Sequence, residues 1–158
     1  MKFYRFLGFV SVLCLCYSTA FSAHAVERLQ FNKSLPDRAQ RNIARYIEEN
    51  SQKIPGISSE SLKISATDLN RDGINEFIIS TKDCSTDSKT CPYLVMADKK
   101  DSVILLGSIE ARNIALADTY SHGIRDIHAY NNKSNDFDYD LFVWEPADSH
   151  YTIKDERR

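Results

Sequence analysis

The sequence is poor in residues that break or cross-link a chain, with 5 glycines, 4 prolines and 4 cysteines among 158 residues. It contains neither a glycine-rich phosphate-binding loop nor a G-x-S-x-G motif, so these signatures of nucleotide binding and of serine hydrolysis are missing. It also lacks a basic excess, since 20 Lys and Arg stand against 22 Asp and Glu. Nucleic-acid binding needs a basic footprint, so this balance argues against a nucleic-acid partner.

The N-terminus has the three parts of a secretory signal peptide. Lys2 and Arg5 precede a mostly apolar run over residues 6–21, and residues 22–25 (SAHA) place small side chains where a signal peptidase reads them. The run of 16 residues is shorter than the roughly 20 that a membrane span needs. We therefore predict cleavage after Ala25 and a periplasmic or secreted protein with no membrane span.

Cleavage would leave 133 residues with 18 basic and 22 acidic side chains, a net charge of −4. That length suits one domain, which we place at residues 34–158, after a lead-in at 26–33 that has no clear pattern.

Two cysteines would remain after cleavage, Cys84 and Cys91, and in an oxidising compartment such a close pair is expected to form a disulfide. Their spacing does not match the C-x-x-C pattern of redox or metal sites. The alternative for the N-terminus is a lipid anchor on Cys14 or Cys16, although a leucine precedes each of them.

The pattern of apolar residues predicts an α+β domain. Residues 36–52 form an amphipathic helix, because Ala39, Ile43 and Ile47 recur at helical spacing. The remainder reads as strands, at residues 62–67, 77–81, 92–97, 102–107, 114–117, 124–130 and 139–144, and a short last strand could follow at 151–153. No helices alternate with these strands, so we expect one antiparallel meander of five to seven strands with the helix packed on one face.

The most informative stretch is the loop between the first two of these strands, residues 68–76 (DLNRDGINE). Oxygen-bearing side chains fall at its first, third, fifth and ninth positions and glycine at its sixth. This spacing wraps a hard cation such as Ca²⁺, and the backbone carbonyl of Ile74 serves at the seventh position. A full EF-hand has glutamate at position twelve, where this chain has Ile79 inside a strand. A tight turn without a metal is the alternative, and Arg71 would partly offset the loop charge.

The segment from Asp68 to Thr81 resembles the calcium loops of integrin α-subunit (FG-GAP) repeats, in which D-x-N-x-D-G-x-x-D/E precedes an apolar strand. The resemblance implies a local calcium site and no global fold, because a propeller would need several copies of the motif. The metal ligands that it implies are Asp68, Asn70, Asp72 and Glu76.

A looser resemblance covers the order helix, D-L-N-x-D-G-x-x-E, cysteine pair, G-I-x-D-I and late aromatic strand, which looks like small periplasmic proteins of Gram-negative bacteria. Their cysteine loop is usually glycine-rich, whereas residues 85–90 here are polar. Proteins of this size and setting include inhibitors of lysozymes and proteins that neutralise toxins.

An enzymatic role would need convergent groups, and His122, Asp126 and His128 are the candidates because they alternate along one predicted strand. Residues 121–123 (SHG) favour a turn, however, which would move His122 out of that strand.

The last third is rich in aromatic residues, so a protein-binding surface is the leading functional hypothesis. Asp138, Asp140, Phe142 and Trp144 share one strand face and form the possible partner surface, unless the strand is buried on both sides. We therefore expect a non-enzymatic binding protein of inhibitor or immunity type, acting on a toxin or cell-wall hydrolase. The alternatives are a calcium-stabilised structural domain of the envelope and a small secreted hydrolase.

Overall fold

The computed structural model describes residues 26–31, 35–54, 57–81, 90–131 and 138–154. The predicted signal peptide and Cys84 lie outside these ranges, so the cleavage site and the Cys84–Cys91 disulfide stay predictions. Within the ranges, no helix is both long and apolar enough to cross a membrane.

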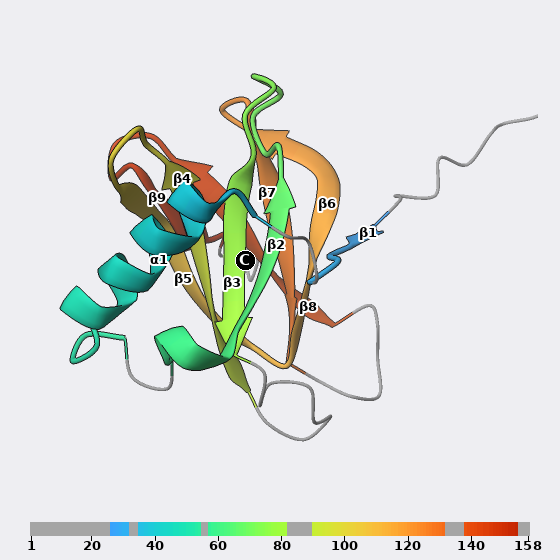
Figure 1. Ribbon diagram of the computed structural model, residues 1–158. Helices are drawn as coiled ribbons and strands as arrows, with labels where there is room; N and C mark the ends of the chain where they lie inside the picture. Colours follow the sequence, from blue (N-terminus) through green and yellow to red (C-terminus); the bar gives the residue numbers. More distant parts are fainter. Residues whose placement is uncertain (1–25, 32–34, 55–56, 82–89, 132–137, 155–158) are drawn as a thin grey trace, which may run out of the picture.

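Two antiparallel sheets and one α-helix make up the described part of the chain (Figure 1). The first sheet has the order β2-β3-β4-β5, from strands Leu62–Thr67, Glu76–Thr81, Cys91–Asp98 and Val103–Ala111. The second has the order β1-β6-β7-β8-β9, from strands Glu27–Arg28, Asn113–Ser121, Ile124–Tyr130, Tyr139–Glu145 and His150–Ile153. The α+β class is confirmed in this coarse form. Nine described strands in two sheets stand where one meander of five to seven was expected.

Helix α1, Asp37–Glu49, packs on the first sheet. Its buried stripe of Ala39, Ile43 and Ile47 meets side chains of that sheet, including Phe77 and Ile79 of β3. A short 3₁₀ turn, η1 (Ser59–Ser61), leads from the helix region into β2. The helix follows from the 3.6-residue period of its apolar positions, which gives it one face to bury.

The second core lies between the two sheets. On β3, Ile78 belongs to this inter-sheet core, whereas its neighbours Phe77 and Ile79 belong to the core under the helix. Successive side chains of a strand point to opposite faces, so β3 is buried on both sides and all six of its residues are buried. The domain therefore has three layers, with the first sheet between α1 and the second sheet.

The chain passes from the first sheet to the second with one residue, Arg112, between β5 and β6. The two sheets approach again where β5 meets β9. A Cβ atom added to Gly107 of β5 would lie 2.8 Å from the Cβ of Tyr151 on β9. Only glycine fits this approach without displacement of a neighbour.

Candidate functional site

The predicted cation loop joins β2 to β3, and its polar side chains turn toward its own backbone. Asp68 accepts hydrogen bonds from the N–H groups of Asp72 (3.2 Å) and Gly73 (2.9 Å). The Asn70 Oδ1 accepts from the Asp72 N–H at 3.0 Å, and the Asp72 Oδ1 accepts from the Ile74 N–H at 2.7 Å. Gly73 has a φ of 83°, which glycine adopts readily. These side-chain oxygens thus accept hydrogen bonds from the backbone of the loop itself, a pattern that a tight turn without a metal also produces.

Glu76, the first residue of β3, is the buried carboxylate of the loop, with 6% of its surface exposed. Its Oε2 accepts a hydrogen bond from the Leu69 N–H at 2.8 Å. Burial raises the pKa of Glu76, and the negative charges of Asp72 and Asp68 raise it further. Burial alone would also raise the pKa of Asp68, but backbone hydrogen bonds, first from Gly73, outweigh it and lower that pKa.

No cation balances these carboxylates within the described residues. The ion pairs found there join Arg38 to Asp98 and Arg125 to Glu27, and neither involves the loop. A buried carboxylate is costly without a cationic partner. The loop therefore carries an excess of negative charge that a bound cation would offset.

The donor set suits an oxygen-seeking cation. Each carboxylate has roughly four lone-pair positions, so Asp68 and Asp72 keep acceptor capacity after bonding to backbone amides. As the side chains stand, no group of three or more His, Cys, Asp or Glu is arranged around a metal position among the described residues. Metal binding would therefore require Asp72 and Asn70 to exchange their mutual hydrogen bond, 2.9 Å from Nδ2 to Oδ2, for contacts with the ion.

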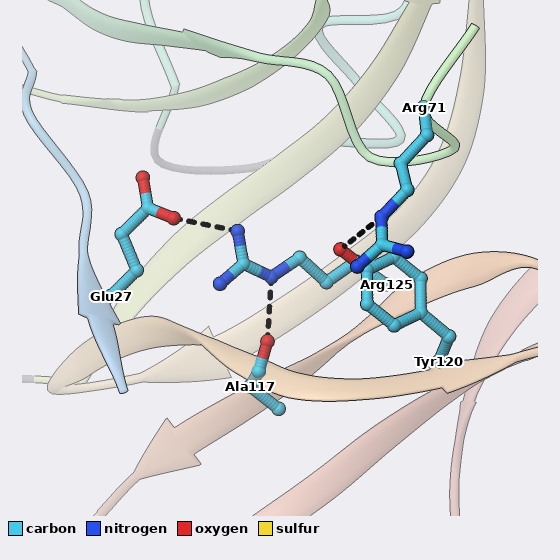
Figure 2. Close-up of polar contacts among 5 residues, drawn as sticks. All are labelled: Glu27, Arg71, Ala117, Tyr120 and Arg125. Atoms are coloured by element: carbon cyan, nitrogen blue, oxygen red, sulfur yellow. Dashed lines mark hydrogen bonds and ion pairs between the residues drawn. The ribbon is translucent and has the colours of Figure 1, made fainter. Parts of the chain in front are cut away.

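Arg71 turns away from the loop carboxylates toward the second sheet. Its Nε donates a hydrogen bond to the Tyr120 hydroxyl at 3.0 Å, and its guanidinium carbon lies 4.1 Å from the centre of the Tyr120 ring (Figure 2). The backbone of Arg71 has a φ of 61°, in the left-handed region that disfavours residues with a Cβ. The contacts of Arg71 therefore join the loop to β6 and do not screen the loop charge directly.

Leu69 provides a second connection to the same sheet. Its side chain is buried in the inter-sheet core, and its carbonyl accepts a hydrogen bond from the Arg125 N–H at 2.8 Å. The Arg125 side chain donates to the Ala117 carbonyl and to Glu27, each at 2.6 Å (Figure 2). The Arg125 carbonyl accepts from the Tyr151 hydroxyl at 2.7 Å. Arg125 thus connects the loop with β1, β6 and β9.

The three residues considered for catalysis do not form one group. His122 is exposed and lies with Gly123 in the turn between β6 and β7, where both have positive φ values of 52° and 83°. Asp126 and His128 are buried on β7, and the Thr119 hydroxyl donates to Asp126 at 2.7 Å. The expected turn at His122 is confirmed, and it keeps this histidine out of the strand that holds the other two.

An aromatic cluster lies at the other end of β7. The His128 ring stacks on Tyr139 with ring centres 3.8 Å apart, and Tyr130 meets Tyr139 edge to face at 5.9 Å. His128 alternates with the core residues Ile127 and Ala129, so the cluster is on the face of the second sheet that points away from the first. Tyr139 keeps 42% of its surface exposed.

The proposed partner surface of Asp138, Asp140, Phe142 and Trp144 requires a correction. Phe142 is 8% exposed and belongs to the inter-sheet core, and Trp144 packs against the same core. Asp138 is exposed, and Asp140 accepts a hydrogen bond from the Asn131 side chain at 3.1 Å. Phe142 is therefore a core residue against which Trp144 packs from the same face, and the opposite face of β8 is the outer one.

Sequence reasoning did not find the contacts that join the loop to the second sheet. Arg71 and Tyr120 are 49 positions apart, and Arg125 and Glu27 are 98 positions apart, so no local spacing indicates either pair. Strand β1 was likewise missed, because its two residues lie in the segment without a pattern. Comparison of the chain with protein-family models, curated proteins and solved structures finds no match.

Proposed function

We propose that the protein is an exported, non-enzymatic domain that binds one calcium ion in the loop at residues 68–76. The ligands are the side chains of Asp68, Asn70, Asp72 and Glu76 and the carbonyl of Ile74. The observation that carries this proposal is Glu76, which is buried, faces two aspartates and has no cationic partner among the described residues.

Calcium is the cation of choice because all the donors are oxygens and several are carboxylates. Five protein groups, one or more of them bidentate, together with water would supply the 6–8 oxygens that calcium takes. Magnesium holds its water tightly and demands near-ideal octahedral geometry, whereas calcium accepts irregular coordination by many oxygens. A single loop of this kind suits the weak extracellular class, with a Kd on the order of 10⁻⁴ to 10⁻³ M.

Isothermal titration of the metal-free protein with calcium tests the proposal. We expect one site per chain, weaker binding of magnesium, and loss of binding in Asp72→Ala. Asp101→Ala is the matched control, because Asp101 is an exposed aspartate in the turn between β4 and β5. Absence of binding in the wild type, or equal binding in Asp72→Ala, would refute the calcium site.

A second candidate function is the binding of a toxin or cell-wall hydrolase, as an inhibitor or immunity-type protein. The observation that favours it is the outer face of the second sheet, where Tyr139 is exposed beside the partly buried Leu141 and Val143. The helix covers only the other sheet. Asp138 adds negative charge at the margin, which would attract a basic partner.

Inhibition of purified muralytic enzymes by the protein tests this candidate. Tyr139→Ser is expected to reduce inhibition at least tenfold, because it removes the exposed ring from the surface. Ile104→Ser is the control, since Ile104 is a similarly exposed apolar residue on β5 of the first sheet. Equal inhibition by the two variants would exclude the Tyr139 face as the contact surface.

A further inference from the structure

We propose that the contact of Arg71 with Tyr120, called the latch below, links the loop to the second sheet. Through this link, calcium binding strengthens the contact between the two sheets at the β6–β7 hairpin. The inference rests on the proposed function for its calcium site. The latch itself stands on contacts of Arg71 and Leu69 that involve no metal ligand side chain other than Glu76.

The backbone of Arg71 is the first observation. A φ of 61° is unfavourable for any residue with a Cβ, and such strain persists only where the surroundings hold it in place. The Arg71 side chain has such a contact, with the hydroxyl of Tyr120 at 3.0 Å and the ring at 4.1 Å. A glycine would adopt this φ without strain, but it would leave the loop without a link to β6.

The second observation is the position of Leu69 between two ligands in the sequence, Asp68 and Asn70. Its N–H donates to Glu76, at 2.8 Å, and its carbonyl accepts from the Arg125 N–H, also at 2.8 Å. A cation that fixes Asp68 and Glu76 would therefore also fix the two peptide groups of Leu69. One of these groups is bonded directly to β7.

The two links act on the same hairpin. Tyr120 and Arg125 are paired across β6 and β7, so Arg71 and Leu69 hold opposite strands of one ladder. The Arg125 side chain extends the connection to Ala117 of β6 and to Glu27 of β1, at the edge of the sheet (Figure 2). Coupling of this kind is reciprocal. The contacts of the latch must therefore strengthen calcium binding by the same free energy as calcium binding strengthens these contacts.

Because of this reciprocity, the latch predicts a change in calcium affinity opposite in direction to the change that electrostatics predicts. Arg71→Gly removes a positive charge from an acidic loop and relieves the left-handed backbone, and both effects alone would tighten calcium binding. Loss of the latch would instead weaken it. Tyr120→Phe removes only the hydroxyl and leaves the charge of the loop unchanged, so electrostatics predicts no effect.

The experiment measures calcium affinity and amide hydrogen exchange for the wild type, Arg71→Gly and Tyr120→Phe, with Tyr46→Phe on α1 as the control. We expect calcium to slow exchange of the amides of residues 117–125 in the wild type. Both latch variants should bind calcium about fivefold more weakly, at the lower end of typical coupling. Tyr46→Phe should match the wild type.

The outcomes separate the two proposals. If the wild type binds calcium but the variants bind it equally or more tightly, with unchanged exchange of residues 117–125, the latch is refuted and the calcium site stands. If the wild type binds no calcium, the coupling and the proposed function both fail. In that case, faster amide exchange in the hairpin of Tyr120→Phe than in the wild type would show that the contact of Arg71 with Tyr120 is purely structural.

Discussion

Replacement of Glu76 by glutamine is expected to change the stability of the protein in opposite directions with and without calcium. In the metal-free protein, Glu76 is a buried carboxylate whose pKa is raised by burial and by Asp72 and Asp68. Glutamine removes that charge, and its amide oxygen can still accept the hydrogen bond from the Leu69 N–H. The metal-free variant should therefore melt at the same temperature as the wild type or above it.

With calcium present, the expected effect has the opposite sign and can be estimated by linkage. A ligand at 100 times its Kd stabilises the folded state by about 2.7 kcal/mol. For a Kd near 10⁻⁴ M, this ratio is reached at roughly 10 mM calcium. One kcal/mol shifts the melting temperature of a domain of this size by about 4 °C, so the wild type should gain roughly 10 °C. Glutamine offers one neutral oxygen in place of a bidentate charge, and the variant should lose most of this gain.

Thermal unfolding followed by circular dichroism, in EDTA and in calcium, provides the measurement. Glu110→Gln is the matched control, because Glu110 is an exposed glutamate on β5 without a role in the loop. The control should follow the wild type in both buffers. A Glu76→Gln variant that melts below the wild type by the same amount in both buffers would refute the reasoning, since Glu76 would then be only a structural acceptor.

Three further predictions concern the metal-free protein and the contacts between its layers. Because the pKa of Glu76 is raised above its ordinary value of 4.5, its contribution to stability is fully present below that value and is lost as the pH rises through the folded-state pKa. Urea unfolding in EDTA should therefore show the wild type gaining stability relative to Glu76→Gln as the pH is lowered from neutrality toward 4.5. Gly107→Ala places a Cβ 2.8 Å from that of Tyr151 and should lower the free energy of unfolding by about 1–3 kcal/mol, measured by urea unfolding. Arg38→Ala removes a 2.6 Å ion pair with Asp98 whose arginine is 53% exposed, so the loss should be below about 1 kcal/mol and should shrink in high salt.

Local patterns predicted the single elements well. Strand β2 has the predicted bounds, residues 62–67, because its apolar and polar side chains alternate. Strand β5 was expected to end at Gly107 but continues to Ala111, since this glycine accommodates Tyr151 within the strand and makes no turn. Strand β6 was expected at residues 114–117 and extends to Ser121 through an irregular stretch that interrupts its pairing with β7.

The arrangement in two sheets was beyond these patterns for a physical reason. Alternation shows which residues share a face, but it does not show what that face packs against. On β8 it correctly separated Phe142 and Trp144 from Tyr139, Leu141 and Val143. The face expected to meet a partner, that of Phe142 and Trp144, is however the face that packs on the inter-sheet core. In the loop, the spacing identified the side chains whose oxygens accept hydrogen bonds from the loop backbone. It did not indicate that Glu76 is buried.

The loop and the exposed aromatic face occupy opposite ends of the second sheet, and this separation bears on how the two candidate functions relate. The loop is bonded to Arg125 near the start of β7, whereas Tyr139 pairs with Tyr130 at its end. Arg125 and Tyr130 are five positions apart along β7, about 17 Å at the usual rise. A calcium ion in the loop therefore lies too far from Tyr139 to contact that side chain, although a protein partner with a standard interface of about 800 Å² could cover both. The calcium site and the Tyr139 face are therefore separate features of the second sheet, and their two functions are compatible.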